Sequence, residues 1–354
     1  MKSKTWSIVL LSLSLATLIL FGSVTAIIDP FFHYHAPLEA LQYPIDDQRY
    51  QNDGIVRHFD YDAIITGTSL TENFKASQFD RLFDRHSVKV CFSGSTYQEL
   101  NNNLRRAFAS NPNIRTVLMA IDGWFLFEEP GSMRTDAEFP LYLYDDNPFN
   151  DVKYLLNKQV LCSRTARVLE YTSWGEKTTN FDDYSFWGNI GYGETGRDIA
   201  LANSPRAEKR DSKAEFSQDA RQKLIDNMTN NAIALAKEHP DVQFLYFFPP
   251  YSILYWDLLI REQEFDRQLE GWQLASQLLL EQENIQLYSF YTDFETVTNL
   301  DNYRDNVHYG DAVNALLLER MAKGEYRLTK ETSDAHWQQV RDFYSGYDYD
   351  AIYS

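Results

Sequence analysis

Cysteine is nearly absent from this chain of 354 residues, which holds only Cys91 and Cys162. Two thiols are too few for a disulfide scaffold or a thiolate metal site. Cys91 lies in an apolar run, where a buried free thiol is the simplest interpretation, and a disulfide with Cys162 is the alternative. His33 and His35 have no third ligand nearby, so we expect a surface role for them. We therefore predict no metal and no cofactor.

Basic residues are also scarce. The chain has 33 Lys and Arg against 51 Asp and Glu, a formal net charge of -18. This charge argues against binding of nucleic acid or an anionic membrane through bulk electrostatics, and it would repel an anionic polymer unless a local basic patch intervenes. A neutral sugar is easier to accommodate. Aromatic residues are plentiful, with 23 Tyr, 23 Phe and 7 Trp, which excludes a disordered chain.

A long uncharged run opens the chain. Lys2 and Lys4 precede it, and its apolar residues continue to Ile28, which is long enough to span a bilayer. The positive-inside rule then leaves the N-terminus in the cytoplasm and the remaining chain outside. We predict that residues 1–28 are an uncleaved membrane anchor. A cleaved signal peptide is the alternative, since Ala26 and the two residues before it form an acceptable cleavage site.

The first strand leads to a serine. Residues 29–57 show no sustained period and are predicted to be an irregular connector. Residues 63–66 are an apolar run typical of a buried strand, and Gly67 allows the chain to turn sharply after it. Ser69 then stands at the start of a helix predicted over 72–83, where free backbone N–H groups favour negative charge.

Strands and helices alternate after this point. The predicted strands cover 63–66, 87–92, 114–121, 242–248 and 285–288, and the predicted helices cover 72–83, 97–110, 218–237, 257–282 and 311–322. This alternation predicts an α/β domain over 58–326 with a parallel sheet covered on both faces. Thr96 and Glu99 match a capping box at the start of helix 97–110. The tail, 327–354, is polar and aromatic and has no assigned role.

Residues 123–215 interrupt the alternation. They are aromatic and loop-like, with one helical stretch near 152–171, and we interpret them as an insertion over the sheet edge, a lid or substrate-binding cap. Residues 191–196 spell the dinucleotide motif G-x-G-x-x-G. No strand precedes this motif and no apolar helix follows it, so we do not predict a dinucleotide site.

The chemistry rests on three residues. A serine hydroxyl is a weak nucleophile, and it needs a neighbouring base that a carboxylate orients. His308 is the candidate base, and Asp305 stands three residues before it, a spacing that lets the carboxylate reach the imidazole in a tight turn. Both lie late in an α/β chain whose first strand leads into Ser69.

These motifs resemble those of the SGNH/GDSL hydrolase superfamily. Gly67-Thr68-Ser69 is similar to its first block, Gly94 to the glycine of its second, and Asp305 with His308 to its fifth. The resemblance implies a flavodoxin-like three-layer α/β/α fold. With its apolar anchor, the chain is most similar to the extracytoplasmic members that act in teichoic-acid D-alanylation and polysaccharide O-acetylation.

The resemblance also implies roles for individual residues. Ser69 would be the nucleophile, His308 the general base and Asp305 the residue that orients it, and the backbone N–H groups of Ser69 and Gly94 would form an oxyanion hole. The family's third donor is an Asn side chain, but this chain has Asp122 there. An ionised Asp122 would repel the oxyanion. Either it is protonated through burial, or it points elsewhere, or another group supplies the donor.

Aromatic residues of the insertion are the candidates for substrate binding. Trp124, Trp187 and Tyr192 can stack on sugar rings, and core packing of the insertion is the alternative. The resemblance implies a cell-surface glycan or teichoic-type polymer as partner, and for a transferase a membrane protein that supplies acyl groups. Three classes stay open at this point: an acyltransferase, a carbohydrate esterase with the same triad, and a non-catalytic glycan-binding or assembly protein.

Overall fold

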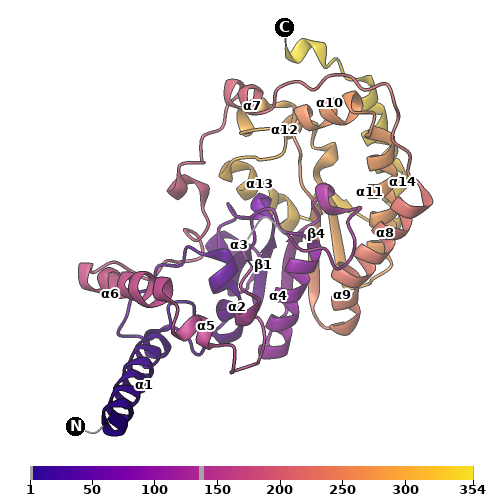
Figure 1. Ribbon diagram of the computed structural model, residues 1–354. Helices are drawn as coiled ribbons and strands as arrows, with labels where there is room; N and C mark the ends of the chain where they lie inside the picture. The colour runs from indigo at the N-terminus through magenta and orange to yellow at the C-terminus, as the bar shows by residue number, and fades with distance from the viewer. Residues whose placement is uncertain (1–2, 135–138, 354) are drawn as a thin grey trace.

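A six-stranded sheet forms the centre of the protein (Figure 1). The computed structural model describes residues 3–134 and 139–353. The strands are β1 (Ala63–Gly67), β2 (Ser87–Cys91), β3 (Thr116–Ala120), β4 (Gln243–Phe248), β5 (Ile285–Ser289) and β6 (Arg327–Leu328), in the spatial order β2-β1-β3-β4-β5-β6. The first five run parallel, as predicted, and β6 is antiparallel to β5. The protein is therefore an α/β protein with a mixed, mostly parallel sheet.

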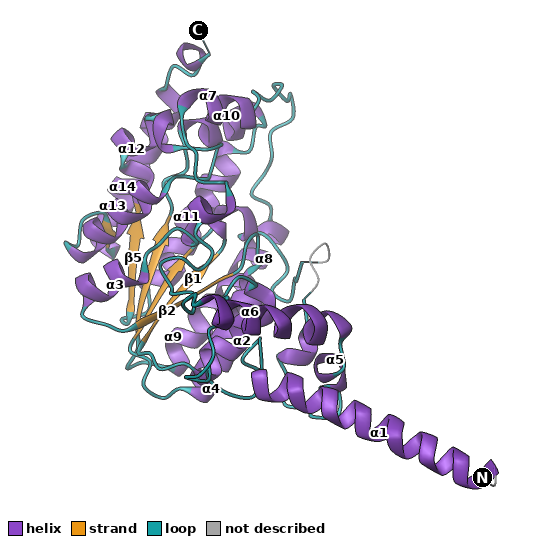
Figure 2. Ribbon diagram, turned by 90° about the vertical axis from the view of Figure 1, so that its left-hand side faces the viewer, coloured by secondary structure: helices purple, strands orange, loops and turns teal. Residues whose placement is uncertain are grey.

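Helices cover both faces of this sheet, and other helices of the chain lie away from it (Figure 2). They are α1 (Ser3–Ile28), α2 (Gln48–His58), α3 (Ala76–Phe83), α4 (Tyr97–Ser110), α5 (Val152–Leu155), α6 (Thr165–Trp174), α7 (Arg197–Asn203), α8 (Gln218–Met228), α9 (Ala234–Glu238), α10 (Ile253–Arg261), α11 (Phe265–Leu280), α12 (Phe294–Thr298), α13 (Asp311–Ala322) and α14 (Lys330–Gly346). On one face α3 packs beside α13, and on the other α2 packs beside α4. Every residue of β1, β2 and β3 is buried, as strands covered on both sides require.

Local sequence signals located several helices. The capping box at the start of α4 is formed: the Thr96 hydroxyl accepts from the Glu99 N–H, and the Glu99 carboxylate accepts from the Thr96 N–H. The helix predicted over 257–282 is instead two helices, α10 and α11, because the chain turns at Gln263, which has a left-handed φ of 60°. The helix predicted over 218–237 is present as α8 and α9, joined by the π-helical turn Thr229–Ile233.

The predicted connector 29–57 is not irregular throughout, because it contains α2. Polar residues of this helix are buried, and they form hydrogen bonds to backbone and side-chain groups of the protein. Gln51 accepts from the N–H groups of Asp46 and Asp47, and Asn52 donates to the Cys91 carbonyl oxygen at 2.8 Å. The sequence of α2 therefore lacks the apolar period that is typical of a buried helix, although the helix is part of the interior.

The C-terminal tail is also part of the fold. It provides β6 and α14, and α14 packs along α11. The Trp337 indole donates to the Ser276 hydroxyl at 3.0 Å, and the Tyr344 hydroxyl donates to the Tyr291 carbonyl oxygen at 2.6 Å. The Tyr344 ring stacks on Trp256 with centroids 3.6 Å apart. The tail therefore covers the end of the core that carries β5.

The apolar helix α1 projects from the domain, and its surface is largely exposed (Figure 2). Its length and composition are those of a membrane-spanning helix, and they fit a signal anchor or a signal sequence.

The two cysteines do not form a disulfide. Both thiols are free, with Cys91 buried and Cys162 exposed. The disulfide alternative is thereby excluded.

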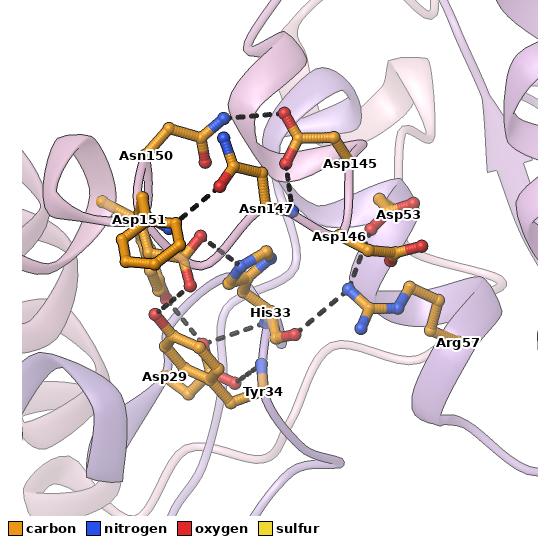
Figure 3. Close-up of polar contacts among 12 residues, drawn as sticks. Asp29, His33, Tyr34, Asp53, Arg57, Asp145, Asp146, Asn147, Asn150 and Asp151 are labelled. Atoms are coloured by element: carbon orange, nitrogen blue, oxygen red, sulfur yellow. Dashed lines mark hydrogen bonds and ion pairs between the residues drawn. The ribbon is translucent and has the colours of Figure 1, made fainter.

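A buried polar network joins α1 to the domain (Figure 3). The Asp29 carboxylate, directly after the helix, accepts from the Tyr154 hydroxyl at 2.6 Å and from the backbone N–H groups of His33, Tyr34 and His35. His33 is buried, and its Nε2 lies 3.3 Å from an oxygen of Asp151. The surface role predicted for His33 is therefore wrong: its ring is part of this junction.

Candidate active site

Ser69 lies just beyond the carboxyl end of β1, between the ends of neighbouring strands β2 and β3. Crevices at this position, where the strand order changes direction, are the usual ligand sites of parallel α/β sheets. Gly67 has a φ of 141°, and a Cβ there would lie 2.8 Å from Thr71 Cγ2, so only glycine fits the turn. Ser69–Thr71 form a 3-10 turn, and α3 begins only at Ala76, so the predicted helix start at Glu72 is wrong.

The structure brings Ser69, His308 and Asp305 together. Ser69 Oγ lies 2.8 Å from His308 Nε2, and His308 Nδ1 lies 2.6 Å from Asp305 Oδ2. With Nδ1–H donated to the carboxylate, Nε2 is left to accept the serine proton. Burial acts to raise the pKa of Asp305, but hydrogen bonds from His308 and from the Val307 N–H outweigh it and hold that pKa below its usual range. Asp305 therefore stays ionised beside the histidine.

The loop that carries this pair is fixed at several points. Tyr303 and Tyr309 form a bridge across it, and the Arg304 N–H donates to the His308 carbonyl oxygen at 2.9 Å. The Tyr303 hydroxyl donates to the Pro250 carbonyl oxygen at 2.7 Å, directly after β4. These hydrogen bonds fix the loop to the end of the central strand β4. The sheet therefore determines where the His308 imidazole lies relative to Ser69.

Two backbone donors of the predicted oxyanion hole are free. Among the residues that the structure describes, the N–H groups of Ser69 and Gly94 have no hydrogen-bond partner. Gly94 has a φ of 59°, a left-handed backbone conformation that glycine adopts without strain. Both N–H groups therefore remain available to a developing negative charge.

Asp122 is an acceptor rather than a donor. Its carboxylate accepts from the Tyr251 hydroxyl, from the Thr68 hydroxyl at 2.9 Å and from the Trp124 N–H at 3.2 Å. Burial raises the pKa of Asp122, while these three hydrogen bonds and the nearby His308 act in the opposite direction. Asp122 thus holds Thr68, the residue before the candidate nucleophile, and it does not supply the third donor in this arrangement.

We expect Asp122→Ala to lower the free energy of unfolding by about 3 kcal/mol, because two hydroxyls and one N–H would lose their acceptor in the interior. Asp122→Asn should restore most of this loss, since an amide oxygen still accepts and the amide NH₂ can donate to the Thr68 hydroxyl. Denaturant titration of the three proteins measures the effect. Equal stability of Asp122→Ala and wild type would contradict this role.

The three aromatic candidates differ in their surroundings. Trp187 is only 6% exposed; its ring meets the His308 imidazole edge-on with centroids 5.2 Å apart. Tyr192 is 54% exposed and lines the cavity at Ser69, whereas Trp124, 52% exposed, does not line it. Trp187 therefore buttresses the imidazole instead of offering an open stacking face, and Tyr192 is the exposed aromatic at the site.

The cavity beside Ser69 has a volume of about 420 Å³. Its lining residues are Ser69, Glu72, Ser93, Trp187, Ile190, Tyr192, Arg304, Asp305 and His308. A larger groove of about 1240 Å³ shares Glu72, Ser93 and Ile190 with it and extends to α6. In the described residues no group of three His, Cys, Asp or Glu side chains could hold a metal ion.

Glu72 and Arg304 were not predicted from the sequence. Glu72 accepts from the Trp187 indole at 2.6 Å and from the Gln48 amide at 2.7 Å, so it fixes the ring that supports His308. The Arg304 guanidinium lies over the Tyr192 ring, 4.7 Å from its centroid. The only sequence signal for Glu72 is its spacing of three residues from Ser69, which by itself resembles an ordinary helix cap.

Lys89 stabilises the backbone that follows Ser69. Its Nζ is buried and donates to the carbonyl oxygens of Glu72 at 2.6 Å and Phe74 at 2.9 Å. Burial lowers the pKa of Lys89 to about 8, against 10.5 for an exposed lysine. A lysine on a buried strand is thus used to hold the backbone that follows Ser69.

This pKa predicts a pH dependence of stability. Between about pH 8 and 10.5 the unfolded chain binds the Lys89 proton more strongly than the folded chain, so the free energy of unfolding rises with pH. We expect the wild type to gain up to about 3 kcal/mol over this interval relative to Lys89→Met. Urea titrations of both proteins across the interval measure the difference, and parallel pH profiles would contradict the prediction.

Comparison of the chain with protein-family models, curated proteins and solved structures found no match. The resemblance to the SGNH/GDSL superfamily therefore depends on the residues themselves and on their geometry.

Proposed function

We propose that this protein is a membrane-anchored, extracytoplasmic serine acyltransferase or esterase of the SGNH type, with a flavodoxin-like α/β/α domain. It acts on acetyl or D-alanyl groups of a cell-surface polysaccharide or teichoic-type polymer. The observation that carries the proposal is the continuous hydrogen-bonded series from Ser69 through His308 to Asp305, with separations of 2.8 and 2.6 Å. Support for the fold comes from the strand order and from the site's position at the end of β1.

The first half-reaction forms an acyl-enzyme. Ser69 Oγ attacks the acyl carbonyl carbon while His308 Nε2 takes the hydroxyl proton. Asp305 stabilises the imidazolium that results, and the N–H groups of Ser69 and Gly94 donate to the oxyanion. When the tetrahedral intermediate collapses, His308 returns its proton to the departing oxygen, and the acyl group stays on Ser69 as an ester.

The second half-reaction decides between transfer and hydrolysis. His308 Nε2 takes a proton from an incoming hydroxyl, whose oxygen attacks the acyl-Ser69 carbonyl carbon. When this second tetrahedral intermediate collapses, the bond to Ser69 Oγ breaks and His308 returns the proton to that oxygen. A sugar or polyol hydroxyl in the groove gives transfer, and water gives hydrolysis. The groove of about 1240 Å³ that adjoins the cavity at Ser69 is the proposed place for the acceptor.

Both acidic and basic residues line this groove, and the acidic ones are Asp46, Asp47, Glu72, Glu176 and Asp183. Arg49, Arg167 and Lys177 line it, and Arg304 lines the adjoining cavity at Ser69. The Arg49 guanidinium donates to the Ser93 carbonyl oxygen at 3.0 Å, beside the site. The acidic residues outnumber these cations, and Arg167 is paired with Asp46, so the lining favours a neutral glycan over an anionic polymer. For transfer, a membrane protein that delivers acyl groups outward is the proposed donor partner.

The test is an acyl-transfer assay with the purified full chain in detergent. A chromogenic acetyl ester is the donor, with and without an added glycan acceptor, and Ser69→Ala is the control. Activity that depends on Ser69 supports the proposal, and faster transfer to glycan than to water identifies a transferase. No turnover and no labelling by a serine-directed phosphonate would instead identify a non-catalytic glycan-binding protein.

A further inference from the structure

A part of the insertion lies against the membrane anchor and not over the sheet edge. Residues 149–174, which we call the collar, contain α5, the π-helical turn Val160–Arg164 and α6, and all three pack against α1 (Figure 2). A Cβ at Gly22 would lie 3.7 Å from Leu156 Cδ2, so the collar reaches helix α1 more than one turn before its end. The collar therefore lies where the apolar helix leaves the domain.

The junction holds the collar in a fixed position relative to α1. Thr25 and Ile28, in the last turns of the helix, are buried, and Asp29 links to Tyr154 of α5 through the network of Figure 3. Phe31 packs with Tyr154 and Val160 in a small separate core. If α1 spans a bilayer, the collar must lie at its surface.

The charge of the collar is opposite to that of the chain. Residues 149–174 carry Lys153, Lys158, Arg164 and Arg167 against Asp151 and Glu170, in a chain with 51 Asp and Glu. The two arginines pair with Asp46 and Asp47, so the two lysines are the free cations of the collar among the described residues. Lys153 and Lys158 are exposed and form no ion pair with any residue that the structure describes. Anionic lipid headgroups attract basic residues of this kind by about 1 kcal/mol each.

Apolar side chains are exposed on the same segment. Phe149 is 90% exposed and Trp174 is 69% exposed, and Val152, Leu156 and Leu169 are exposed beside them. Aromatic and aliphatic side chains next to lysines are typical of segments that lie in the headgroup layer, where Trp is enriched. Water is an unfavourable environment for this surface, and the border of a bilayer is a favourable one.

We propose that the collar is a second, peripheral membrane contact, which lies in the headgroup layer around α1 and binds anionic phospholipid. This inference rests on the membrane anchoring in the proposed function, but not on acyl transfer. The proposal also places the groove relative to the membrane, because Arg167 and Tyr171 of α6 in the collar line one end of the groove. That end of the groove would then open at the lipid surface, and Ser69 would lie further from it.

Cys162 allows a direct test, because it is exposed in the collar whereas Cys91 is buried. The full chain is labelled at Cys162 with an environment-sensitive fluorophore and reconstituted into phosphatidylcholine vesicles with or without phosphatidylglycerol. Quenching by lipids that carry a quencher near the headgroup is then measured. We expect strong quenching and a blue-shifted emission, both greater in the vesicles that contain phosphatidylglycerol.

Variants test the contribution of charge. Lys153→Glu with Lys158→Glu should shift the equilibrium at least about 25-fold toward the undocked collar, since each lysine contributes about fivefold. Lys209→Glu with Lys323→Glu is the matched control on exposed lysines near α10 and α13, which Figure 2 shows away from α1. It should leave the quenching unchanged. Equal quenching in both pairs, or in both kinds of vesicle, would overturn the anionic-lipid contact.

Two further labels separate the possible failures, each in a Cys162→Ser background. A label at Leu13→Cys, within α1, reports insertion of the anchor through lipids that carry the quencher in the acyl chain, and a label at Ser345→Cys, on α14, reports background. Quenching at residue 13 with only background quenching at residue 162 would overturn the collar contact alone. Background quenching at residue 13 would overturn the membrane anchoring as well. Neither readout depends on the activity of Ser69.

Discussion

Ser69→Ala is expected to lower the turnover of an acyl ester by at least about a thousandfold, because no other hydroxyl of the described residues is hydrogen-bonded to His308 Nε2. Ser69 Oγ is 2.8 Å from His308 Nε2, and the next hydroxyl along the chain, on Thr68, is bound to Asp122. Steady-state kinetics with a chromogenic ester measure kcat and KM separately. The loss should appear in kcat, since removal of one oxygen leaves the cavity otherwise intact.

The control for Ser69→Ala is its stability. Among the residues that the structure describes, the Ser69 side chain bonds only to His308, so the midpoint of denaturant unfolding should match that of the wild type. Ser93→Ala is the matched variant, because Ser93 lines the same cavity and lies outside the triad. Ser93→Ala should retain most of the activity. If Ser69→Ala retained it equally, Ser69 would not be the nucleophile.

Asp305→Asn is expected to lower kcat by about 10³- to 10⁴-fold. The amide no longer carries the charge that stabilises an imidazolium, and its NH₂ can favour the wrong imidazole tautomer, in which Nε2 bears the proton and cannot accept from Ser69. The amide oxygen can still accept from the N–H groups of Val307 and His308, so the loop should keep its shape. Kinetics with the same ester, together with a crystal structure of the variant, measure both effects.

Asp301→Asn is the matched control for Asp305→Asn. Asp301 belongs to the same loop, but its side chain accepts from the Arg197 N–H and does not contact His308. Its replacement should leave kcat within about threefold of the wild type. Because hydrogen bonds hold the pKa of Asp305 below its usual range, mild acidification should not protonate this carboxylate. An Asp305→Asn protein as active as the wild type would exclude the proposed role of the carboxylate.

The parallel sheet and several helices could be predicted because their signals are local. Residues 63–66 and 116–120 are apolar runs with β-branched residues, which are typical of buried parallel strands. Thr96 and Glu99 mark the start of α4 within three residues of each other. Ser69, Asp305 and His308 were found from their positions at the ends of such elements, although 239 residues separate the serine from the histidine.

The remaining features depend on contacts between distant segments. The α14 helix is stable because Trp337 and Tyr344 pack into the core, and the polarity of its sequence conceals this. Asp122 was identified as the departure from the family pattern, but its partner Tyr251 lies 129 residues away, so its role as an acceptor could not be inferred. The collar was interpreted as part of a lid because nothing in residues 152–171 indicates that they pack on α1.

Labelling by a serine-directed phosphonate tests the central claim most directly. The full chain is incubated with the reagent and digested, and mass spectrometry locates the adduct, with His308→Gln as the matched variant. The account predicts a single adduct on Ser69 in the wild type and a rate of labelling at least about a hundredfold lower in the variant, because the serine then lacks its base. No adduct on Ser69, or equally fast labelling without His308, would contradict it.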